Sequence, residues 1–309
     1  MRIALNPPGE RPVIASLYTP TRYTRPTTKT TDSKNAKEAT IKLTILTYNT
    51  LFAGRDGSDD RRAQVQIGLI NDVKPDVFLM QEAKGFDANG GAWLYALEQK
   101  IGMRGFLAIA PRTGQNVAIF IREPLRAVSF DADGAHFHHA LATLRVALPD
   151  SDRQITFISA HLCPNGPEVR RREAAYLAVQ AAPDKLTLLT GDFNSVSPHD
   201  LEPEGFDALA AHHRARYLAD DLRTADRRVL AHLEAAGWVD VGHALDGASA
   251  PTVPTAGFIG TEFAPMRCDY LLASQALAVH AQSYQVIRNE ASDMASDHYP
   301  VLTTFEVSR

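Results

Sequence analysis

The first clear pattern along the chain is an apolar run, a helical spacing and a second apolar run. Apolar residues alternate with polar ones over 41–48, which predicts a strand. The apolar residues of 60–73 share one helical face, and 76–82 is a second strand-like run. These three segments predict a βαβ unit, in which Asn49 and Glu82 stand at the ends of the strands.

The remaining chain divides into elements by the same reasoning. Helices are expected over 91–101 and 167–181, and a polar helical region over 199–233. A short extended piece is expected at 237–241 and a loop over 251–265. The short connections 112–116 and 149–152 are typical of antiparallel hairpins. Further strands are expected over 106–110, 117–121, 140–148, 154–160, 186–194, 267–272, 278–287 and 301–307.

One predicted strand ends in a pair of polar side chains with chemical potential. The apolar run from Leu186 leads through Gly191 to Asp192 and Asn194, which are two residues apart and face the same side of an extended backbone. A carboxylate and a carboxamide with one aim can hold a hard cation, orient a water molecule or bind a phosphate oxygen. An ordinary Asx turn explains the same residues equally well in isolation.

Polar residues stand at the other predicted strand ends as well. If the strands line up, these side chains converge on one rim, and the set is rich in carboxylates. Carboxylates packed together repel one another and need a cation, and oxygen ligands favour Mg²⁺, Mn²⁺ or Ca²⁺ over zinc. Histidines add acid–base or charge-stabilising groups. The residues of this set are Asn49, Glu82, His161, Asp192, Asn194, Asp269, Asp297 and His298.

Composition narrows the function classes. The chain has 309 residues and a formal net charge of -4, which argues against a long nucleic-acid groove and leaves only local DNA or RNA contacts. Without a membrane-spanning run or a secretory h-region, the expected location is cytoplasmic, and a monomer is expected. Residues 1–40, rich in Pro, Thr and Lys, are expected to be a flexible or loosely docked extension, and 41–309 a single domain.

Six short motifs together resemble the endonuclease/exonuclease/phosphatase superfamily, the metal-dependent phosphohydrolases similar to pancreatic deoxyribonuclease and apurinic-site endonucleases. Each motif is weak alone, but they occur in the family's order. The resemblance implies an α/β fold, a four-layer α/β sandwich of two mostly antiparallel sheets packed face to face with helices outside. The motifs are Thr47-Tyr48-Asn49-Thr50, Gln81-Glu82, Ser159-Ala160-His161-Leu162, Gly191-Asp192-Phe193-Asn194, Arg267-Cys268-Asp269-Tyr270 and Ser296-Asp297-His298-Tyr299-Pro300.

The resemblance also implies roles for the metal-binding residues. Glu82 would be the principal ligand of Mg²⁺, with Asn49 and Asp297 close to the ion. Mn²⁺ or Ca²⁺ would be alternative ions.

The same resemblance implies the catalytic roles. Asp192 would position or deprotonate the attacking water, and Asn194 would hold that water or a phosphate oxygen. His298, oriented by Asp269, would contact the scissile phosphate, while His161 would bind another phosphate oxygen or assist the leaving group. Physically this is an in-line displacement on phosphorus.

Several residues outside the motifs are candidate substrate contacts with a simpler alternative beside each. Asn165 lies in a Pro-Asn-Gly segment that is also an ordinary turn sequence. Arg170 begins a basic run that is also typical of a solvated helix face. His213 and Arg216 belong to a segment, 212–228, that is either a positively charged lid or a salt-bridged helical insertion.

Two further groups near the motifs have expected roles outside the chemistry. The histidine cluster His136, His138 and His139 is expected to be a solvated loop or an entrance to the site rather than a metal centre. Cys163 and Cys268 are expected to be buried structural thiols, since two cysteines do not make a disulfide framework.

The substrate stays open at this level. The main hypothesis is a phosphodiesterase, acting as a nuclease or on a small phosphodiester. The alternatives are a phosphomonoesterase on a small phosphorylated metabolite and a non-catalytic phosphate-ligand binding protein. His161 stands where apurinic-site endonucleases have Tyr, which argues against abasic-site repair. Together with 167–181 and Gly237-Trp238-Val239-Asp240, it resembles a broad bacterial branch of uncertain substrate.

Overall fold

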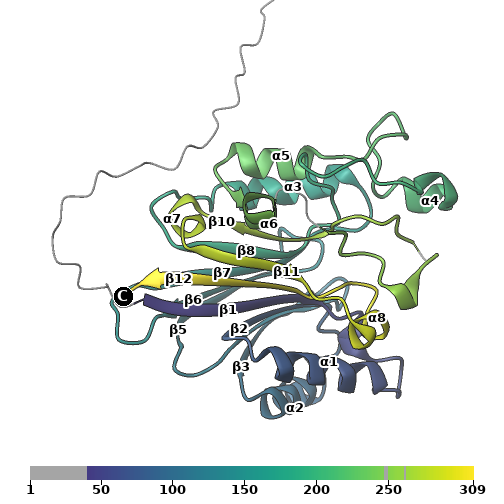
Figure 1. Ribbon diagram of the computed structural model, residues 1–309. Helices are drawn as coiled ribbons and strands as arrows, with labels where there is room; N and C mark the ends of the chain where they lie inside the picture. The colour runs from purple at the N-terminus through teal and green to yellow at the C-terminus, as the bar shows by residue number, and fades with distance from the viewer. Residues whose placement is uncertain (1–39, 247–249, 261) are drawn as a thin grey trace, which may run out of the picture. The chain divides into compact units, whose positions relative to one another are not determined.

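Two six-stranded β-sheets lie face to face, with helices on their outer sides (Figure 1). The computed structural model describes residues 40–246, 250–260 and 262–309, so the extension predicted for 1–40 lies almost wholly outside the described residues. The first sheet has the order β11-β12-β1-β2-β4-β3 and the second β5-β6-β7-β8-β10-β9. The first comprises β11 (Ala281–Val286), β12 (Val301–Ser308), β1 (Thr40–Asn49), β2 (Val77–Gln81), β4 (Val117–Ile121) and β3 (Arg104–Ala108). The second comprises β5 (Arg126–Asp133), β6 (Leu141–Ala147), β7 (Gln154–His161), β8 (Thr187–Asp192), β10 (Asp269–Ala273) and β9 (Val239–Asp240).

Each sheet is antiparallel except for one central pair of parallel strands. In the first sheet β1 and β2 are parallel, as the predicted βαβ unit requires. In the second sheet the parallel pair is β7 and β8. The predicted hairpins β3–β4 and β6–β7 are antiparallel. In each parallel pair, both strands therefore have their carboxyl ends at the same end of the sheet. In open α/β folds, ligands bind at the carboxyl ends of the strands.

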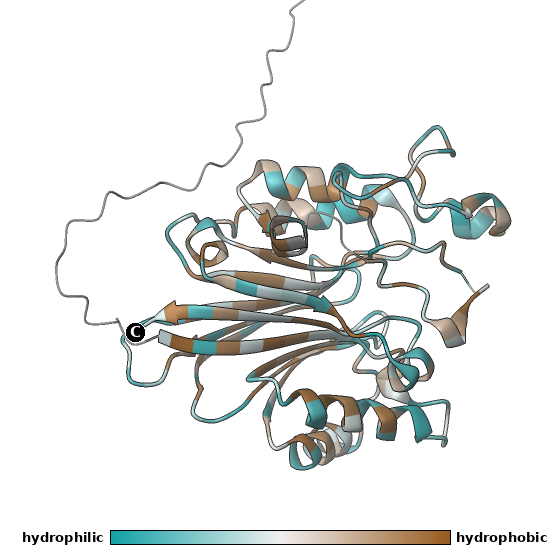
Figure 2. Cartoon of the chain, in the orientation of Figure 1, coloured by the Kyte–Doolittle hydropathy of each residue, from teal (hydrophilic) through white to brown (hydrophobic). Residues whose placement is uncertain are grey.

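Three apolar clusters explain the layers, because alternating side chains of one strand point to opposite faces. The cluster between the sheets contains Leu43 and Ile45 of β1 together with Leu188 of β8. Their neighbours Leu46 in β1 and Leu189 in β8 point outward, into separate clusters under the helices. Figure 2 shows the resulting alternation of hydrophobic and hydrophilic residues along the strands. This arrangement confirms the four-layer α/β sandwich.

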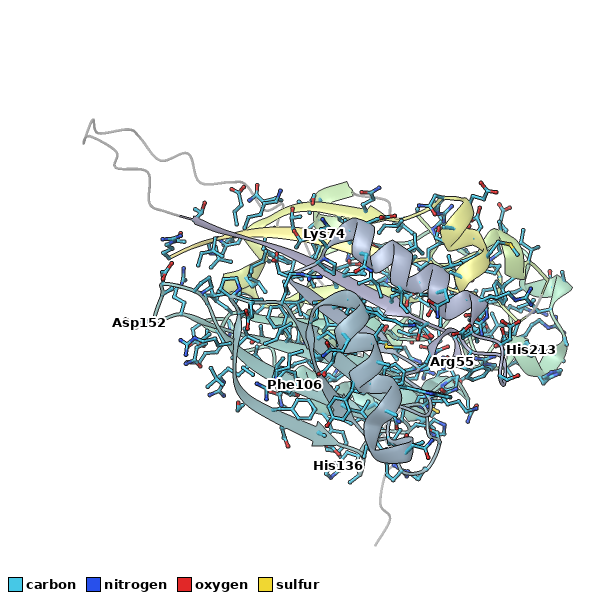
Figure 3. The ribbon with its side chains drawn as sticks, turned by 90° about the horizontal axis from the view of Figure 1, so that it is seen from below. Arg55, Lys74, Phe106, His136, Asp152 and His213 are labelled. Carbon is cyan, nitrogen blue, oxygen red and sulfur yellow. The ribbon has the colours of Figure 1, made fainter. Side chains whose placement is uncertain are left out.

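The helices divide between the two outer faces. On the first sheet lie α1 (Arg61–Val73) and α2 (Ala92–Ile101), which Figure 3 shows from their own side. On the second sheet lie α3 (Pro167–Ala178) and α5 (Arg228–Ala235). None of the described helices has the length and apolarity needed to cross a membrane. The short helices are α4 (Ala211–Arg214), α6 (Val241–Asp246), α7 (Gln275–Ala278) and α8 (Glu290–Ala295), with 3-10 turns η1 (Phe52–Gly54), η2 (Ala88–Gly91), η3 (Phe206–Ala208) and η4 (Ala256–Phe258).

The prediction of a helical region over 199–233 is wrong for most of its length. Only α4 and α5 are α-helical there, and the rest consists of turns. The reason is that the apolar residues of the segment do not face one helix. Phe206, Tyr217 and Leu218 instead pack with Val253 and Phe263 of the later loop in a separate cluster.

Three smaller elements also depart from the sequence-based predictions. The extended piece expected at 237–241 is shortened to β9, and a helix follows it at once. Strand β5 was not predicted, since it is an exposed edge strand with a polar sequence. Helix α8 was not predicted either; it is six residues long and begins with a capping box between Asn289 and Ser292.

Candidate active site

The polar strand ends converge on one pocket, as the sequence predicted. In the ladders, Asp192 of β8 lies beside His161 of β7 on one side and Asp269 of β10 on the other. The pocket measures about 480 Å³. Asn49 and Asp269 are fully buried beneath it. Of the residues predicted from sequence, the pocket is lined by Glu82, His161, Asn165, Asp192, Asn194, His213, Arg216, Asp297 and His298.

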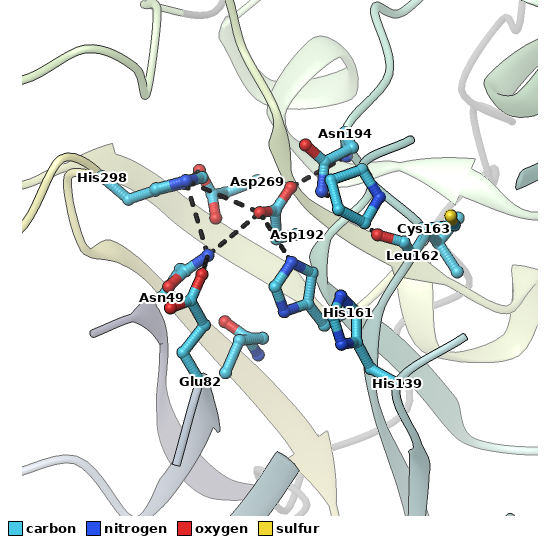
Figure 4. Close-up of polar contacts among 12 residues, drawn as sticks. Asn49, Glu82, His139, His161, Leu162, Cys163, Asp192, Asn194, Asp269 and His298 are labelled. Atoms are coloured by element: carbon cyan, nitrogen blue, oxygen red, sulfur yellow. Dashed lines mark hydrogen bonds and ion pairs between the residues drawn. The ribbon is translucent and has the colours of Figure 1, made fainter. Parts of the chain in front are cut away.

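Asp192 is the centre of the hydrogen-bond network in this pocket (Figure 4). Its Oδ2 accepts from the Asn49 amide nitrogen at 3.0 Å and lies 3.4 Å from His161 Nε2 and 3.5 Å from His298 Nε2. Its Oδ1 accepts the backbone N–H of Asn194 at 2.8 Å, so the Asx turn of the simpler interpretation is present and leaves Oδ2 in the pocket network. The Asn194 amide nitrogen in turn donates to the Leu162 carbonyl. The carboxylate is thus held from several sides.

His298 and Asp269 form a buried charged pair, as the resemblance implied. His298 Nδ1 lies 2.8 Å from Asp269 Oδ2. Burial by itself lowers the pKa of His298, but the carboxylates of Asp269 and Asp192 outweigh burial and hold it well above its ordinary value. The two carboxylates therefore favour the protonated form of the imidazole. The alternative pairing of Asp269 with Arg267 is absent from the described residues, because Arg267 binds Asp200 and Asp240 instead.

Glu82 is held by an unusual backbone. Its own φ is 59°, and Leu51 and Phe52 opposite it also have positive φ, of 45° and 58°. This geometry turns the N–H of Phe52 onto Glu82 Oε2 at 3.0 Å, while Asn49 donates to Oε1 at 3.3 Å. Burial, and next the charge of Asp297, raise the pKa of Glu82 to about 7. Two carboxyl groups that repel one another in a pocket are a fitting site for a cation.

The donor atoms discriminate among the candidate metal ligands. Asn49 donates from its amide nitrogen to the carboxylates of Glu82 and Asp192, and its oxygen accepts the N–H of Leu51. In this arrangement it bridges two acids and does not present its oxygen to a metal ion. Asp192, Asp269 and His298 also lie close enough to share an ion, with ligand atoms within 4.8 Å of one another. Both ring nitrogens of His298 already face carboxylates, however. Glu82 and Asp297 have the oxygen donors that a hard cation prefers.

A second buried histidine accompanies His161. The ring of His139 stacks on it with centroids 4.2 Å apart and an interplanar angle of 27°. His139 Nδ1 lies 2.8 Å from the hydroxyl of Thr113, and the residue lines the pocket. Burial, and next the charge of His298, lower the pKa of His161 to about 3, so it is neutral. Of the predicted histidine cluster, His139 belongs to the site, whereas His136 is an exposed partner of Asp133.

The predicted substrate contacts separate into two groups. Asn165, His213 and Arg216 line the pocket, and Figure 3 places His213 at the opposite end of the sheets from Asp152. Arg170 does not line the pocket. It is 1% exposed, and its guanidinium donates to Ser195 Oγ and to the carbonyls of Cys163 and Arg216. Both interpretations of Arg170, substrate contact and solvated face, are wrong because all its nitrogens are used inside the protein.

The segment 212–228 is salt-bridged, as one of its two interpretations predicted. His213 and Arg216 line the pocket. Arg216 is ion-paired to Glu262, and His213 Nδ1 lies 3.7 Å from the same carboxylate. Arg216 also donates to the Pro164 carbonyl at 2.9 Å, which joins the segment to the loop after β7. A salt-bridged insertion therefore forms part of the pocket wall. Glu262 and Phe263 were not predicted as site residues, since the loop before them carries no motif.

Both cysteines are buried and free, as predicted. Cys163 Sγ accepts the backbone N–H of Asn165 at 3.4 Å, and Cys268 packs in the apolar cluster with Tyr217 and Phe263. Neither thiol lines the pocket within the described part of the chain.

Comparison with known proteins extends the picture. The model of the Endonuclease/Exonuclease/phosphatase family matches residues 46–298. An AP endonuclease from Archaeoglobus fulgidus has a TM-score of 0.61 and 22% identity, covering 85% of this chain and 99% of its own. A mannosyl-6-phosphatase from Bacteroides thetaiotaomicron VPI-5482 has a TM-score of 0.61 and 18% identity, covering 86% of this chain and 99% of its own.

An endonuclease/exonuclease/phosphatase family protein from Bacteroides thetaiotaomicron has a TM-score of 0.63 and 16% identity, covering 88% of this chain and 100% of its own. No curated protein sequence matches the chain. At these identities the solved structures show a shared fold. Because the family model spans most of the sequence, the chain belongs to the Endonuclease/Exonuclease/phosphatase family.

Proposed function

We propose that the protein is a divalent-metal-dependent phosphoester hydrolase that directs a water molecule in line at phosphorus. The observation that carries the proposal is the position of Asp192. Its Oδ2 is shared by Asn49, His161 and the cationic His298, in the same pocket as the carboxyl groups of Glu82 and Asp297. Metal-assisted phosphoryl hydrolysis needs a base, a fixed positive charge and an acidic site for a metal ion. Asp192, His298 and the Glu82–Asp297 pair would supply these three components.

The residues of this chain would divide the work as follows. Asp192 would orient the water and accept its proton, because its carboxylate is fixed and lines the pocket. His298, held cationic by Asp269, would neutralise charge on the phosphoryl oxygens. His161 is neutral and would serve as a hydrogen-bonding group rather than as a charge.

The metal-binding role goes to Glu82 and Asp297, with Asn49 holding the carboxylates of Glu82 and Asp192 in place. Mg²⁺ is the first choice and Mn²⁺ or Ca²⁺ the alternatives, because the donors are oxygens and no thiol of the described chain lines the pocket. When bound, such an ion would neutralise charge on the phosphoester and polarise it as a Lewis acid.

A phosphodiester is the first substrate class to test, and a phosphomonoester is the second. The fold neighbours include an AP endonuclease and a mannosyl-6-phosphatase, so the fold accommodates both kinds of enzyme. The net charge of -4 favours a small ester or a local nucleic-acid contact over a long polyanion. A non-catalytic binding protein is disfavoured because Glu82, Asp192 and His298 are all present and in contact with one another through Asn49.

The experiment is hydrolysis of bis(4-nitrophenyl) phosphate and 4-nitrophenyl phosphate with Mg²⁺, with Mn²⁺ and with chelator. Wild type should be active only with metal. Glu82→Gln and Asp192→Asn should each lose about 10²-fold or more in kcat. Asp152→Asn, an exposed carboxylate at the far end of the sheets, is the matched control. Equal activity in chelator, or full activity of Glu82→Gln, would exclude the metal mechanism. Tight phosphate binding without hydrolysis of any ester would favour the binding protein.

A further inference from the structure

A largely apolar groove of about 440 Å³ adjoins the candidate active-site pocket. Its walls are formed by residues of 205–210, before α4, and by residues 259–260 and 263–265, after η4. Its apolar lining includes Leu209, Ile259, Phe263, Ala264 and Pro265, and His213 is the only ionisable side chain that lines it among the described residues. The groove thus differs sharply from the neighbouring pocket, which is lined by several acids and histidines.

The groove and the pocket share a wall. His213 and Phe263 line both of them. The ring of Phe263 also meets the ring of His298 nearly edge-on, at an interplanar angle of 83° with centroids 5.4 Å apart. The ring of Phe263 therefore contacts His298 and also lines the groove.

Part of the apolar lining of the groove is exposed, whereas Phe263 and Ala264 are buried. Ile259 is 76% exposed, and Leu209 is half-buried. Charged residues near the groove are paired among themselves, since Arg214 binds Asp207. Glu262 is likewise occupied by Arg216 and His213. Exposed apolar surface beside a polar site marks a ligand-binding region.

We propose that this groove binds an apolar group of the substrate, so that the substrate is an amphiphilic organic phosphoester. The inference rests on the proposed function for the position of the phosphoryl group. Nucleic acid is the less suitable occupant, because no Lys or Arg lines the groove to meet a phosphate backbone. An apolar group would bury the side chains of Ile259 and Leu209 without stranding any charge.

The test uses ligands that the enzyme cannot hydrolyse. Methyl-, butyl- and octylphosphonate carry the same head group on apolar chains of increasing length, and calorimetry with Mg²⁺ gives the Kd of each. Each methylene group that becomes fully buried should tighten binding by up to about fourfold. Wild type should therefore bind octylphosphonate at least about tenfold more tightly than methylphosphonate.

Variants then locate the binding of the chain. Ile259→Ser and Leu209→Ser should each reduce the octyl-to-methyl ratio at least about threefold, and the double variant should bring it close to one. Val279→Ser is the control, because Val279 is also an exposed aliphatic residue, at the end of α7 and outside both the groove and the pocket. Far-UV circular dichroism confirms that each variant is folded.

Two results would overturn the inference. One is a wild-type ratio near one. The other is a large ratio that the double variant leaves unchanged, which would place the alkyl chain elsewhere. Neither outcome depends on catalysis, so failure of the hydrolysis assay with a chain-length effect intact would refute the proposed function and leave the groove assignment standing.

Discussion

The imidazole of His139 stacks on that of His161, with ring centroids 4.2 Å apart and an interplanar angle of 27°. His139 is itself fixed by the hydroxyl of Thr113, 2.8 Å from its Nδ1. Since His161 reaches Asp192 through Nε2, the stack determines the plane in which that contact is made. His139 is therefore a positioning residue for His161 in the proposed reaction.

Removal of the stacked ring should lower the rate of chemistry. We expect His139→Ala to reduce kcat about tenfold with little change in KM, because misplaced catalytic groups affect the transition state more than binding. His139→Phe keeps a flat ring of similar size and should retain most of the activity. His136→Ala, an exposed residue of the same loop, serves as the control. Equal activity of the Ala and Phe variants would show that the stack positions nothing.

Asp269 should matter through its charge rather than its shape. Asp269→Asn keeps the size of the side chain but removes the nearest carboxylate of His298. The cationic form of His298 then loses support, and we expect kcat to fall about 10²-fold or more. Steady-state kinetics on the substrate found in the hydrolysis assay measures this loss.

The pH profile of the same variant gives a second readout. A folded-state pKa that is raised keeps His298 protonated as pH rises, so loss of the carboxylate should move the alkaline decline of activity to lower pH. An unchanged kcat and pH profile would contradict the role of the pair.

The sheets and the polar residues at their strand ends were predictable, because both depend on the local pattern of apolar and polar residues. Alternation in β1 and the apolar run of β8 placed Asn49 and Asp192 at strand ends, and one parallel pair in each sheet brings such ends together. The register of the β6–β7 hairpin also indicates that His139 lies near His161. Because Leu141 pairs with Ala160, the residues just before β6 must lie beside His161.

The pocket walls were not predictable in the same way. Phe263 of the pocket wall lies in a loop and is placed by packing against the buried Tyr217, 46 positions earlier in the sequence. Arg170 reads as one of three adjacent arginines, and nothing local reveals that it alone is buried. Loop conformation depends on such nonlocal contacts, which periodicity does not encode.

Metal binding should be visible without any substrate. A cation between Glu82 and Asp297 relieves their repulsion, so Mg²⁺ should raise the melting temperature and chelator should reverse the rise. At a hundredfold excess over Kd the stabilisation is about 2.7 kcal/mol. Glu82→Gln should abolish the rise, while Asp152→Asn should keep it.

The metal effect should also depend on pH. A ligand must be deprotonated to bind the ion, and the pKa of Glu82 is raised to about 7. Below that value the proton competes with the metal. The Mg²⁺-induced rise in melting temperature, followed by differential scanning calorimetry, should therefore be larger at pH 8 than at pH 6. A rise of the same size at both pH values would exclude Glu82 as the principal ligand.

Arg170 should stabilise the fold and the pocket wall together. Its guanidinium joins α3 to Ser195 at 3.1 Å, to the Cys163 carbonyl at 3.0 Å and to the Arg216 carbonyl at 2.5 Å. Arg170→Met fills the space but removes every donor and leaves buried acceptors unpaired. We expect a loss of about 3 kcal/mol in the free energy of unfolding, measured with urea.

The matched control for Arg170 is its neighbour Arg171, which is exposed. Arg171→Met should change stability by no more than about 0.5 kcal/mol. Because Arg170 donates to the backbone carbonyl of Arg216, Arg170→Met should also bind methylphosphonate more weakly than wild type. Arg170→Lys should restore this binding only in part, because an ammonium group lacks the planar arrangement of donors of a guanidinium. Wild-type stability in Arg170→Met would mean that the three contacts contribute nothing net. Reduced stability with unchanged phosphonate binding would mean that Arg216 keeps its place without the clamp.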